Sequence, residues 1–444
     1  MRVIIIGGIA AGMSAAEKLK RMKPEAEVIV YEKKRYISFG ACGLPYYIGN
    51  FFEEHERMLV RKPEQMEKAG IQVQIEHEVI SVDPSKKAVL VRNMNTNEEF
   101  LDSYDQLMVA TGASAVNPPI KGLELNRVHC LRSLEDGFAI RDLVNSDSIK
   151  RVGIIGAGFI GLEVADAIHH LGKKAVVFQL QDRILPDAFD AEITDILEEE
   201  LHASGVELYL NTKVLELSGE HHVEQVVTDQ GMVDVDAVIV AAGVRPNTAF
   251  LKDTGMELLP NGAIVIDSEG RTSIPDIYAA GDCATVKHQQ KNHPAYIPLA
   301  TNANKMGRIV GENLAGQTME FQGTLGSSCL KVMNLEAGRT GLSESEARSL
   351  GIDYKSIFIT DKNHTDYYPN QDKISVKLIY DAKTKVVIGG QIVGKSDAVM
   401  RTNVLATAIA AKMTTAQLGM LDLCYAPPFS RTWDVLNLAG NVAK

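Results

Sequence analysis

The stretch Gly156-Ala157-Gly158-Phe159-Ile160-Gly161-Leu162-Glu163 directly follows the apolar run Arg151–Ile155 and opens the helical pattern Gly161–Leu171. Glycines at this spacing allow a tight turn and let backbone N–H groups reach a pyrophosphate at the positive end of a helix. A strand before the motif and a helix after it make the short match specific. The stretch therefore predicts a Rossmann-type unit for a nicotinamide dinucleotide, with these candidate residues: Gly156, Gly158, Phe159, Ile160, Gly161 and Glu163.

The next strand, Ala175–Phe178, ends at Gln179, where an NAD-specific site often has an acidic residue for the ribose 2′-hydroxyl. A carboxylate there repels the 2′-phosphate of NADP, whereas glutamine does not. Arg183 and the pair Lys173-Lys174 are expected to add attraction. We therefore expect both NADH and NADPH to be accepted, and we add Gly243, in the turn after the buried strand Ala237–Ala242, to the site.

A second unit of the same kind opens the chain, with strand Arg2–Ile6, helix Gly12–Met22 and strand Glu27–Tyr31. The turn between its first strand and helix reads Gly7-Gly8-Ile9-Ala10-Ala11-Gly12, so Ile9 replaces the expected second glycine. Glu32 ends the next strand, where a carboxylate can bind an adenosine ribose. The alternative is that Gly8 and Gly12 are glycines needed only for packing.

The rest of the chain fits an α/β protein with two Rossmann-like domains. Its 444 residues allow roughly two to four domains. Between the two units, Val73–Val82 and Lys87–Arg92 are typical of antiparallel strands, and Gln106–Ala110 and Ile277–Ala280 of buried strands. From about residue 321 the pattern indicates a separate α+β module, with strands at Ser356–Thr360, Ile374–Tyr380 and Val386–Val393 and a helix at Ala398–Lys412.

Composition and charge exclude several classes of protein. The formal net charge of −11 argues against a general nucleic-acid binder. No apolar run reaches the roughly 18 residues of a membrane span, and we expect a cytoplasmic protein without a signal peptide. The cysteines are widely spaced, so neither a metal site nor a disulfide framework is indicated: Cys42, Cys130, Cys283, Cys329 and Cys424.

Three further segments carry a resemblance that covers the whole chain. Ala110-Thr111-Gly112, Thr272–Asp282 and Pro298-Leu299-Ala300 resemble the signature of the flavoprotein disulfide reductases with two dinucleotide-binding domains. The resemblance implies FAD at the first unit, with residues 1–115 and 246–320 as the FAD domain, 116–245 as the NAD(P)H domain and 321–444 as a dimerisation domain. The FAD contacts it implies are Gly7, Gly8, Ile9, Ala10, Ala11, Gly12, Glu32, Lys33, Val79, Ala110, Thr111, Gly112, Asp282, Pro298 and Ala300.

The candidate redox centre is Cys42, within Ser38-Phe39-Gly40-Ala41-Cys42-Gly43-Leu44-Pro45-Tyr46. Glutathione-reductase-like members have two cysteines here, and this chain has one, so its oxidised form must be a mixed disulfide or a sulfenic acid. The string closely resembles coenzyme A-disulfide reductases and their NADH oxidase and persulfide reductase relatives, although Ala41 stands where those reductases often have Asn. We expect a helix beginning near Cys42, with the flavin close by, to lower the thiol pKa and hold a reactive thiolate.

The resemblance also implies a coenzyme A site and a homodimer. Ser14, Lys18 and Arg21 form one stripe of the first helix, and Ala15, Ala16, Leu19 and Met22 its packing face. The corresponding helix of coenzyme A-disulfide reductases contacts coenzyme A, to which we also assign Ser38, Asn302 and Lys305. Two tyrosine motifs, around Tyr367 and Tyr425, resemble those in which tyrosines of one subunit reach the cysteine of the other; a solvated basic helix and ordinary turn tyrosines are the alternatives.

The resulting hypothesis is a reductase that uses NAD(P)H, FAD and Cys42 to reduce coenzyme A disulfide, with Tyr367 and Tyr425 as further catalytic residues. One alternative is an NADH oxidase or peroxidase working through a Cys42 sulfenic acid, for which His55 and His77 are poorly placed. Another is a coenzyme A persulfide or polysulfide reductase. A third is an electron-transfer flavoprotein of the ferredoxin-reductase type, which does not need a cysteine at position 42.

Overall fold

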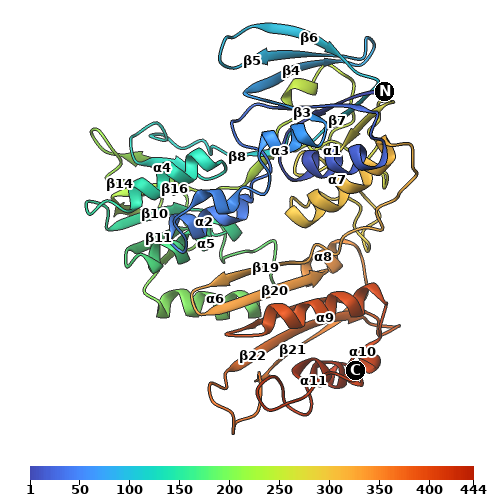
Figure 1. The fold of residues 1–444 in the computed structure, drawn as a ribbon. Helices are drawn as coiled ribbons and strands as arrows, with labels where there is room; N and C mark the ends of the chain where they lie inside the picture. Colours follow the sequence, from blue (N-terminus) through green and yellow to red (C-terminus); the bar gives the residue numbers. More distant parts are fainter.

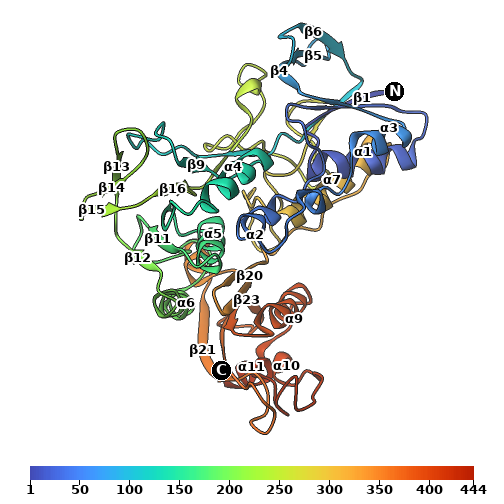
Figure 2. The same ribbon diagram turned by 60° about the vertical axis from the view of Figure 1, so that its left-hand side comes forward.

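The computed structural model describes residues 1–444, which fold into three layered regions around three five-stranded sheets (Figures 1 and 2). The first sheet is parallel, in the order β18-β7-β1-β2-β3. It consists of β1 (Arg2–Ile6), β2 (Glu27–Glu32), β3 (Ile71–Ile75), β7 (Gln106–Val109) and β18 (Ile277–Ala279). The central strands β1 and β2 are rich in Val and Ile and buried on both faces, as helix-covered parallel strands must be, whereas the edge strand β3 exposes Gln72 and Gln74.

Two helices of this region lie side by side in both views, α1 (Ala10–Met22) and α7 (Ala300–Leu314). Glycines on α7 make this close approach possible. A Cβ at Gly307 would lie 2.3 Å from the carbonyl oxygen of Ala11, and one at Gly311 would lie 2.6 Å from that of Ala15. Shorter helices follow β2, namely the 3₁₀ turn Ala41–Gly43, α2 (Leu44–Ile48), the 3₁₀ turn His55–Met58 and α3 (Pro63–Lys68).

The prediction of a single strand at Val73–Val82 is wrong, because the structure has two strands there, β3 and β4 (His77–Asp83). Glu76 between them has φ of 56°, a left-handed conformation that ends the extended run. β4 then pairs antiparallel with β5 (Ala88–Asn93), as expected, and β5 with β6 (Glu99–Ser103). These three strands form a small sheet at the top of Figure 1.

The second region has a parallel sheet of similar arrangement, in the order β12-β11-β10-β16-β9, but its edge strand β9 precedes β10 in the chain, whereas β18 is the last strand of the first sheet. Its strands are β9 (Val128–Cys130), β10 (Arg151–Ile155), β11 (Lys174–Phe178), β12 (Glu207–Tyr209) and β16 (Ala237–Val240), and its helices are α4 (Leu134–Val144), α5 (Phe159–His170) and α6 (Ala191–Ala203). A small antiparallel sheet is attached, with β13 (Val214–Ser218), β14 (Gln225–Thr228) and β15 (Gly231–Asp234). The two regions are linked by the pair β8 (Ala113–Ala115) and β17 (Val244–Pro246), and the 3₁₀ turn Ala249–Leu251 follows.

The third region is an antiparallel sheet in the order β19-β20-β23-β22-β21, covered by helices. Its strands are β19 (Ser328–Val332), β20 (Leu335–Gly341), β21 (Tyr354–Lys362), β22 (Lys373–Asp381) and β23 (Val387–Gly394); its helices are α8 (Glu344–Ser349), α9 (Ala398–Ala410), α10 (Thr415–Gly419) and α11 (Val435–Val442). The three strands and the long helix expected here are present with slightly different ends.

One hydrophobic core crosses the regions. It contains Leu44 and Ile48 of α2, the apolar faces of β10 and α5, and Leu330 and Val332 of β19. The helix that follows Cys42 is therefore fixed against both the second and the third regions. The domain boundaries at residues 115, 245 and 320 remain our proposal. No helix in the structure combines the length and apolar character needed to cross a membrane.

Candidate active site

The turn after β1 has the geometry of a dinucleotide-binding turn. Gly7 has φ of 106°, and a Cβ there would lie 2.2 Å from the carbonyl oxygen of Ala110. A Cβ at Gly12 would lie 1.9 Å from the carbonyl oxygen of Gly7, so only glycine lets α1 approach β1. Ile9 stands directly before α1 and makes no side-chain cap. The N–H groups at the start of α1 are thus available to a phosphate.

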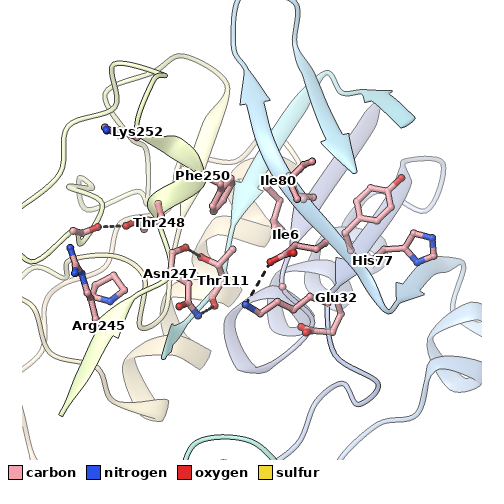
Figure 3. A pocket seen from close by; sticks show the side chains of 18 of the residues that line it. Ile6, Glu32, His77, Ile80, Thr111, Arg245, Asn247, Thr248, Phe250 and Lys252 are labelled. Carbon is pink, nitrogen blue, oxygen red and sulfur yellow. Dashed lines mark hydrogen bonds and ion pairs between the residues drawn. The ribbon is translucent and has the colours of Figure 1, made fainter. Parts of the chain in front are cut away.

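Glu32 ends β2 and faces this turn. It is buried, and its carboxylate accepts hydrogen bonds from the N–H groups of Gly8 and Lys34, both at 2.8 Å. Beside it lies a cavity of about 850 Å³, large enough for a nucleotide. Figure 3 shows the side chains that line it. Five residues assigned to FAD from the sequence are among them: Gly7, Glu32, Lys33, Val79 and Thr111.

Several lining residues were not predicted from the sequence, most clearly Asn247. Its amide donates to the carbonyl oxygen of Thr111 at 3.0 Å, and the Thr111 hydroxyl donates to the carbonyl oxygen of Asn247 at 2.7 Å (Figure 3). This reciprocal pair closes the cavity between segments that are 136 residues apart in the chain. The pairing of β8 with β17 brings them together, and no local motif signals it. The other lining residues missed include His77, Arg245 and Thr248.

The second dinucleotide turn, between β10 and α5, has the same construction. Gly156 has φ of 107°, and a Cβ at Gly161 would lie 2.0 Å from the carbonyl oxygen of Gly156. A Cβ at Gly158 would meet nothing within 4 Å, so the space before the helix is open. Gln179 takes the place that Glu32 has in the first unit, since its Oε1 accepts a hydrogen bond from the Ala157 N–H at 2.9 Å. This cradle suits the pyrophosphate of a second dinucleotide.

The surroundings of Gln179 correct one expectation about the 2′-phosphate. Lys174 begins β11, at the end opposite to Gln179, and pairs with Glu207 at 2.6 Å. Lys173 donates to the carbonyl oxygen of Ser146 at 2.8 Å. The two lysines are therefore excluded from the ribose site by strand direction. Arg183 remains a candidate for the 2′-phosphate, because its backbone carbonyl oxygen accepts a hydrogen bond from Gln179 Nε2 at 3.3 Å. Its side-chain Nε is buried without a hydrogen-bond partner.

Replacing Gln179 with Glu is expected to lower kcat/KM for NADPH about tenfold relative to NADH, because a buried carboxylate would repel the 2′-phosphate. Steady-state kinetics with both nucleotides measure this ratio. Gln230→Glu is the matched control, since it makes the same charge change at an exposed position of the same region. An unchanged ratio in Gln179→Glu would mean that this position does not face the ribose.

Cys42 lies in the 3₁₀ turn Ala41–Gly43, immediately before α2. All five cysteines are free, and the Cys42 residue reaches the surface. The negative charges of two carboxylates act on its thiol, one from each dinucleotide region: Glu163 in α5 and Asp282 after β18. Arg132, which pairs with Asp282 at 2.7 Å, brings a positive charge that opposes them.

The protein's own groups raise the pKa of the Cys42 thiol, so the lowering expected from the helix is wrong, and the effect of the flavin stays a prediction. Desolvation raises the pKa of this thiol, the negative charges of Glu163 and Asp282 raise it further, and Arg132 opposes them. The helix that follows has only five residues and begins two residues after the cysteine, so it contributes little. Burial first, and then Asp166, raise the pKa of Glu163 itself to about 7.

Glu163→Gln is expected to accelerate the alkylation of Cys42 by iodoacetamide severalfold at pH 8. Above its own pKa of about 7, Glu163 is negative and holds the thiol pKa up. Removing that charge lowers the thiol pKa and increases the thiolate fraction at a given pH. Peptide mass spectrometry across pH 6–9 separates Cys42 from the other cysteines. Glu199→Gln, an exposed change on α6, is expected to alkylate at the parent rate; no acceleration in Glu163→Gln would refute the charge effect.

The residues assigned to coenzyme A are only partly brought together. The Ser14 hydroxyl donates to Asn304 Oδ1 of α7 at 2.9 Å, and Lys18 pairs with Glu312 at 2.9 Å. Arg21 and Lys305 are exposed, and so is Met22, which was expected on the packing face. Asn302 is buried, with its amide donating to the carbonyl oxygen of Ile297 at 3.1 Å. This burial does not favour its role as a coenzyme A contact, and Asn304 is the exposed polar residue beside Ser14.

Pro298 and Ala300 flank the start of α7, where the sequence resemblance expects the flavin ring. Ser38, assigned to coenzyme A, has φ of 47° and donates its N–H to the carbonyl oxygen of Gly8 at 2.9 Å. The segment before Cys42 is thereby tied to the first dinucleotide turn. This hydrogen bond therefore fixes the position of the Cys42 segment relative to the expected FAD site.

Tyr367 and Tyr425 come from different loops of the third region and meet through their hydroxyl groups, which are 3.0 Å apart. Both residues are exposed, by 71% and 44%, so the pair is presented outward rather than buried. The hydrogen bond to Tyr425 raises the pKa of Tyr367. In Figures 1 and 2 the β21–β22 connection that carries Tyr367 lies at the opposite end of the third region from α2.

Two Rossmann-like units, a glycine cradle in each and a free cysteine between them define a dinucleotide-dependent oxidoreductase with FAD and NAD(P)H as cofactors. The chain belongs to the pyridine nucleotide-disulphide oxidoreductase family, whose pattern matches residues 1–307, and that family's dimerisation domain matches residues 327–435. The protein is therefore a flavoprotein oxidoreductase that forms a homo-oligomer.

Three relatives illustrate the range of this family. The chain is 38% identical to the NAD(P)H coenzyme A polysulfide/persulfide reductase of Pyrococcus horikoshii, covering 100% of this chain and 98% of that protein. It is 31% identical to the coenzyme A disulfide reductase of Staphylococcus aureus, covering 100% of both. The solved structure of a water-forming NADH oxidase from Lactobacillus brevis bound to NADH has a TM-score of 0.96 at 32% identity, covering 100% of this chain and 98% of that one.

Proposed function

We propose that the protein uses NAD(P)H to reduce coenzyme A disulfide to coenzyme A, through a mixed disulfide between Cys42 and coenzyme A. The observation that carries the proposal is the free, exposed Cys42 directly before α2, in a segment that the Ser38–Gly8 hydrogen bond joins to the first dinucleotide turn. Relatives that act on coenzyme A sulfur support the choice of substrate.

The proposed binding sites follow from the two cradles. The turn Gly7–Gly12, Glu32 and the cavity beside it would hold FAD, and the turn Gly156–Gly161 with Gln179 would hold NAD(P)H. When bound, these cofactors supply a pair of electrons, taken from the nicotinamide and delivered to sulfur. The protein's own part is to align them and to keep Cys42 accessible.

Cys42 does the sulfur chemistry in this proposal. Its thiolate attacks one sulfur of coenzyme A disulfide, forming the Cys42–coenzyme A bond and expelling one coenzyme A thiolate, which takes up a proton. Two electrons then cleave the mixed disulfide, releasing the second coenzyme A thiolate and restoring the Cys42 thiolate. Tyr367 and Tyr425 of the second subunit would donate the proton to the leaving thiolate.

A second candidate substrate is a coenzyme A persulfide or polysulfide. The identity to the Pyrococcus relative, 38%, exceeds that to the disulfide reductase, 31%. The Cys42 thiolate would then attack the outer sulfur of the persulfide, forming a Cys42 persulfide and expelling the coenzyme A thiolate, which takes up a proton. Two electrons and a second proton would cleave the Cys42 persulfide, releasing hydrogen sulfide and restoring the thiolate.

The test is the anaerobic oxidation of NADH and of NADPH, followed by absorbance, with coenzyme A disulfide, polysulfide or hydrogen peroxide as separate acceptors. A parallel assay with oxygen alone measures the oxidase reaction. We expect coenzyme A disulfide to give the highest kcat/KM. A higher value with polysulfide would favour the second candidate, and a dominant oxygen or peroxide reaction would contradict both.

A further inference from the structure

Arg401 of α9 is a buried arginine with an unusual set of partners. Only 8% of the residue is exposed, so its charge must be satisfied inside the protein. Its Nε donates a hydrogen bond to one oxygen of Asp434 at 2.9 Å, and its Nη2 forms an ion pair with the same oxygen at 2.8 Å. The position of Asp434 is also fixed, because its other oxygen accepts a hydrogen bond from the N–H of Leu436, the second residue of α11.

The same guanidinium reaches both tyrosine loops. Its Nη2 donates to the carbonyl oxygen of Asn363, four residues before Tyr367, and to that of Phe429, four residues after Tyr425, each at 3.0 Å. A planar fork of several fixed donors can make these bonds together, and a lysine ammonium at the end of a flexible stem cannot reproduce that arrangement. One buried side chain thus sets the position of two separate loop backbones.

Two further contacts carry this arrangement from the loop bases to the tyrosines. The Thr365 hydroxyl donates to the carbonyl oxygen of Pro427 at 3.1 Å, which joins the loops directly. The Tyr367 and Tyr425 hydroxyls then meet at 3.0 Å. Because both phenols are exposed, burial does not hold their geometry; the bonds at the base of the loops do.

We propose that Arg401 is a positioning residue that holds the Tyr367 and Tyr425 loops together, so that the two phenols act as one hydrogen-bonded proton donor. One hydroxyl donates to the other, which leaves the second proton free for a leaving thiolate; water returns the proton afterwards. The proposal rests on the proposed function, because it concerns how that proton is delivered to sulfur.

Arg401→Lys is the main test variant, because it keeps a charge for Asp434 but not the fork. Arg401→Met combined with Asp434→Asn removes both charges and is the second variant, in case an unmatched charge impairs folding. Arg348→Met, at an exposed arginine of the same region that bonds only to the Tyr354 hydroxyl, is the control. We expect both test variants to lower kcat for coenzyme A disulfide about tenfold with little change in KM, while the rate of flavin reduction by NADPH is unchanged.

A double-mutant cycle separates positioning from general destabilisation. In a Tyr367→Phe/Tyr425→Phe background, Arg401→Lys is expected to cause no further loss of kcat, because no proton donor is left to position. A further tenfold loss in that background, or a full kcat in the Arg401 variants, would overturn the proposal.

A readout independent of activity keeps the proposal testable if the substrate is different. With 3-fluorotyrosine incorporated, the ¹⁹F resonance of Tyr367 is assigned as the one lost in Tyr367→Phe. We expect it to shift in Tyr425→Phe, and to shift in the same way in Arg401→Lys but not in Arg348→Met. An unshifted resonance in Arg401→Lys would refute the positioning role, whereas the expected shift in a protein whose parent form does not turn over coenzyme A disulfide would refute only the proposed function.

Discussion

Replacing Cys42 with serine is expected to lower the turnover of coenzyme A disulfide about 10³-fold or more, with FAD still bound. A serine hydroxyl is a far weaker nucleophile than a thiolate and cannot form a disulfide, so the proposed covalent step is lost. FAD is expected to stay because its proposed contacts, including Gly7, Glu32 and Thr111, lie elsewhere. Anaerobic kinetics measure the first effect, and the ratio of flavin to protein absorbance the second.

Cys424→Ser is the matched control, because Cys424 is also free and exposed and we give it no catalytic role. It is expected to keep the parent rate. Turnover of Cys42→Ser within tenfold of the parent would show that another group carries the electrons. Loss of FAD in Cys42→Ser alone would leave the catalytic role of the thiol undecided, so the rate is compared only in protein with full flavin content.

The second large effect is expected from removing both phenol hydroxyls. Tyr367→Phe and Tyr425→Phe together are expected to lower kcat for coenzyme A disulfide about 100-fold, because a general acid typically contributes a factor of this order. Each single change is expected to cost less, since the remaining phenol can still donate. Tyr368→Phe, at a neighbouring exposed tyrosine, is the control and is expected to leave kcat unchanged.

Mixed dimers test whether the tyrosines act on the other subunit. Dimers that contain one Cys42→Ser chain and one Tyr367→Phe/Tyr425→Phe chain would have one complete active site if the sites are shared. We therefore expect activity to return when the two inactive variants are refolded together. If the mixture remained as inactive as its components while light scattering showed intact dimers, the tyrosines would have to act within their own chain or not at all.

The turns around Gly7 and Gly156 could be predicted from the sequence because the signal is local. A strand, a glycine at a left-handed φ and a helix stand next to one another in the chain, and the structure confirms both units. The positions that end the second strands, Glu32 and Gln179, follow from the same unit. The side chain of each accepts a hydrogen bond from a backbone N–H group of the dinucleotide-binding turn in its own unit.

Other features depend on contacts between distant segments and left no local signal. The approach of Asn247 to Thr111 depends on the pairing of β8 with β17. The Cys42 pKa depends on Glu163 and Asp282, which approach the thiol only in the folded chain. The positioning role proposed for Arg401 could not be predicted from the sequence either. An arginine in a helical pattern is ordinarily expected to be solvated, whereas this one is buried.

Intact-protein mass spectrometry after anaerobic treatment with coenzyme A disulfide tests the central claim most directly. We predict one coenzyme A adduct per subunit, located at Cys42 by peptide mapping, absent in Cys42→Ser and released when NADPH is added. An adduct at a different cysteine, a disulfide between Cys42 and another cysteine of the chain, or no NADPH-reducible adduct at all would contradict the account.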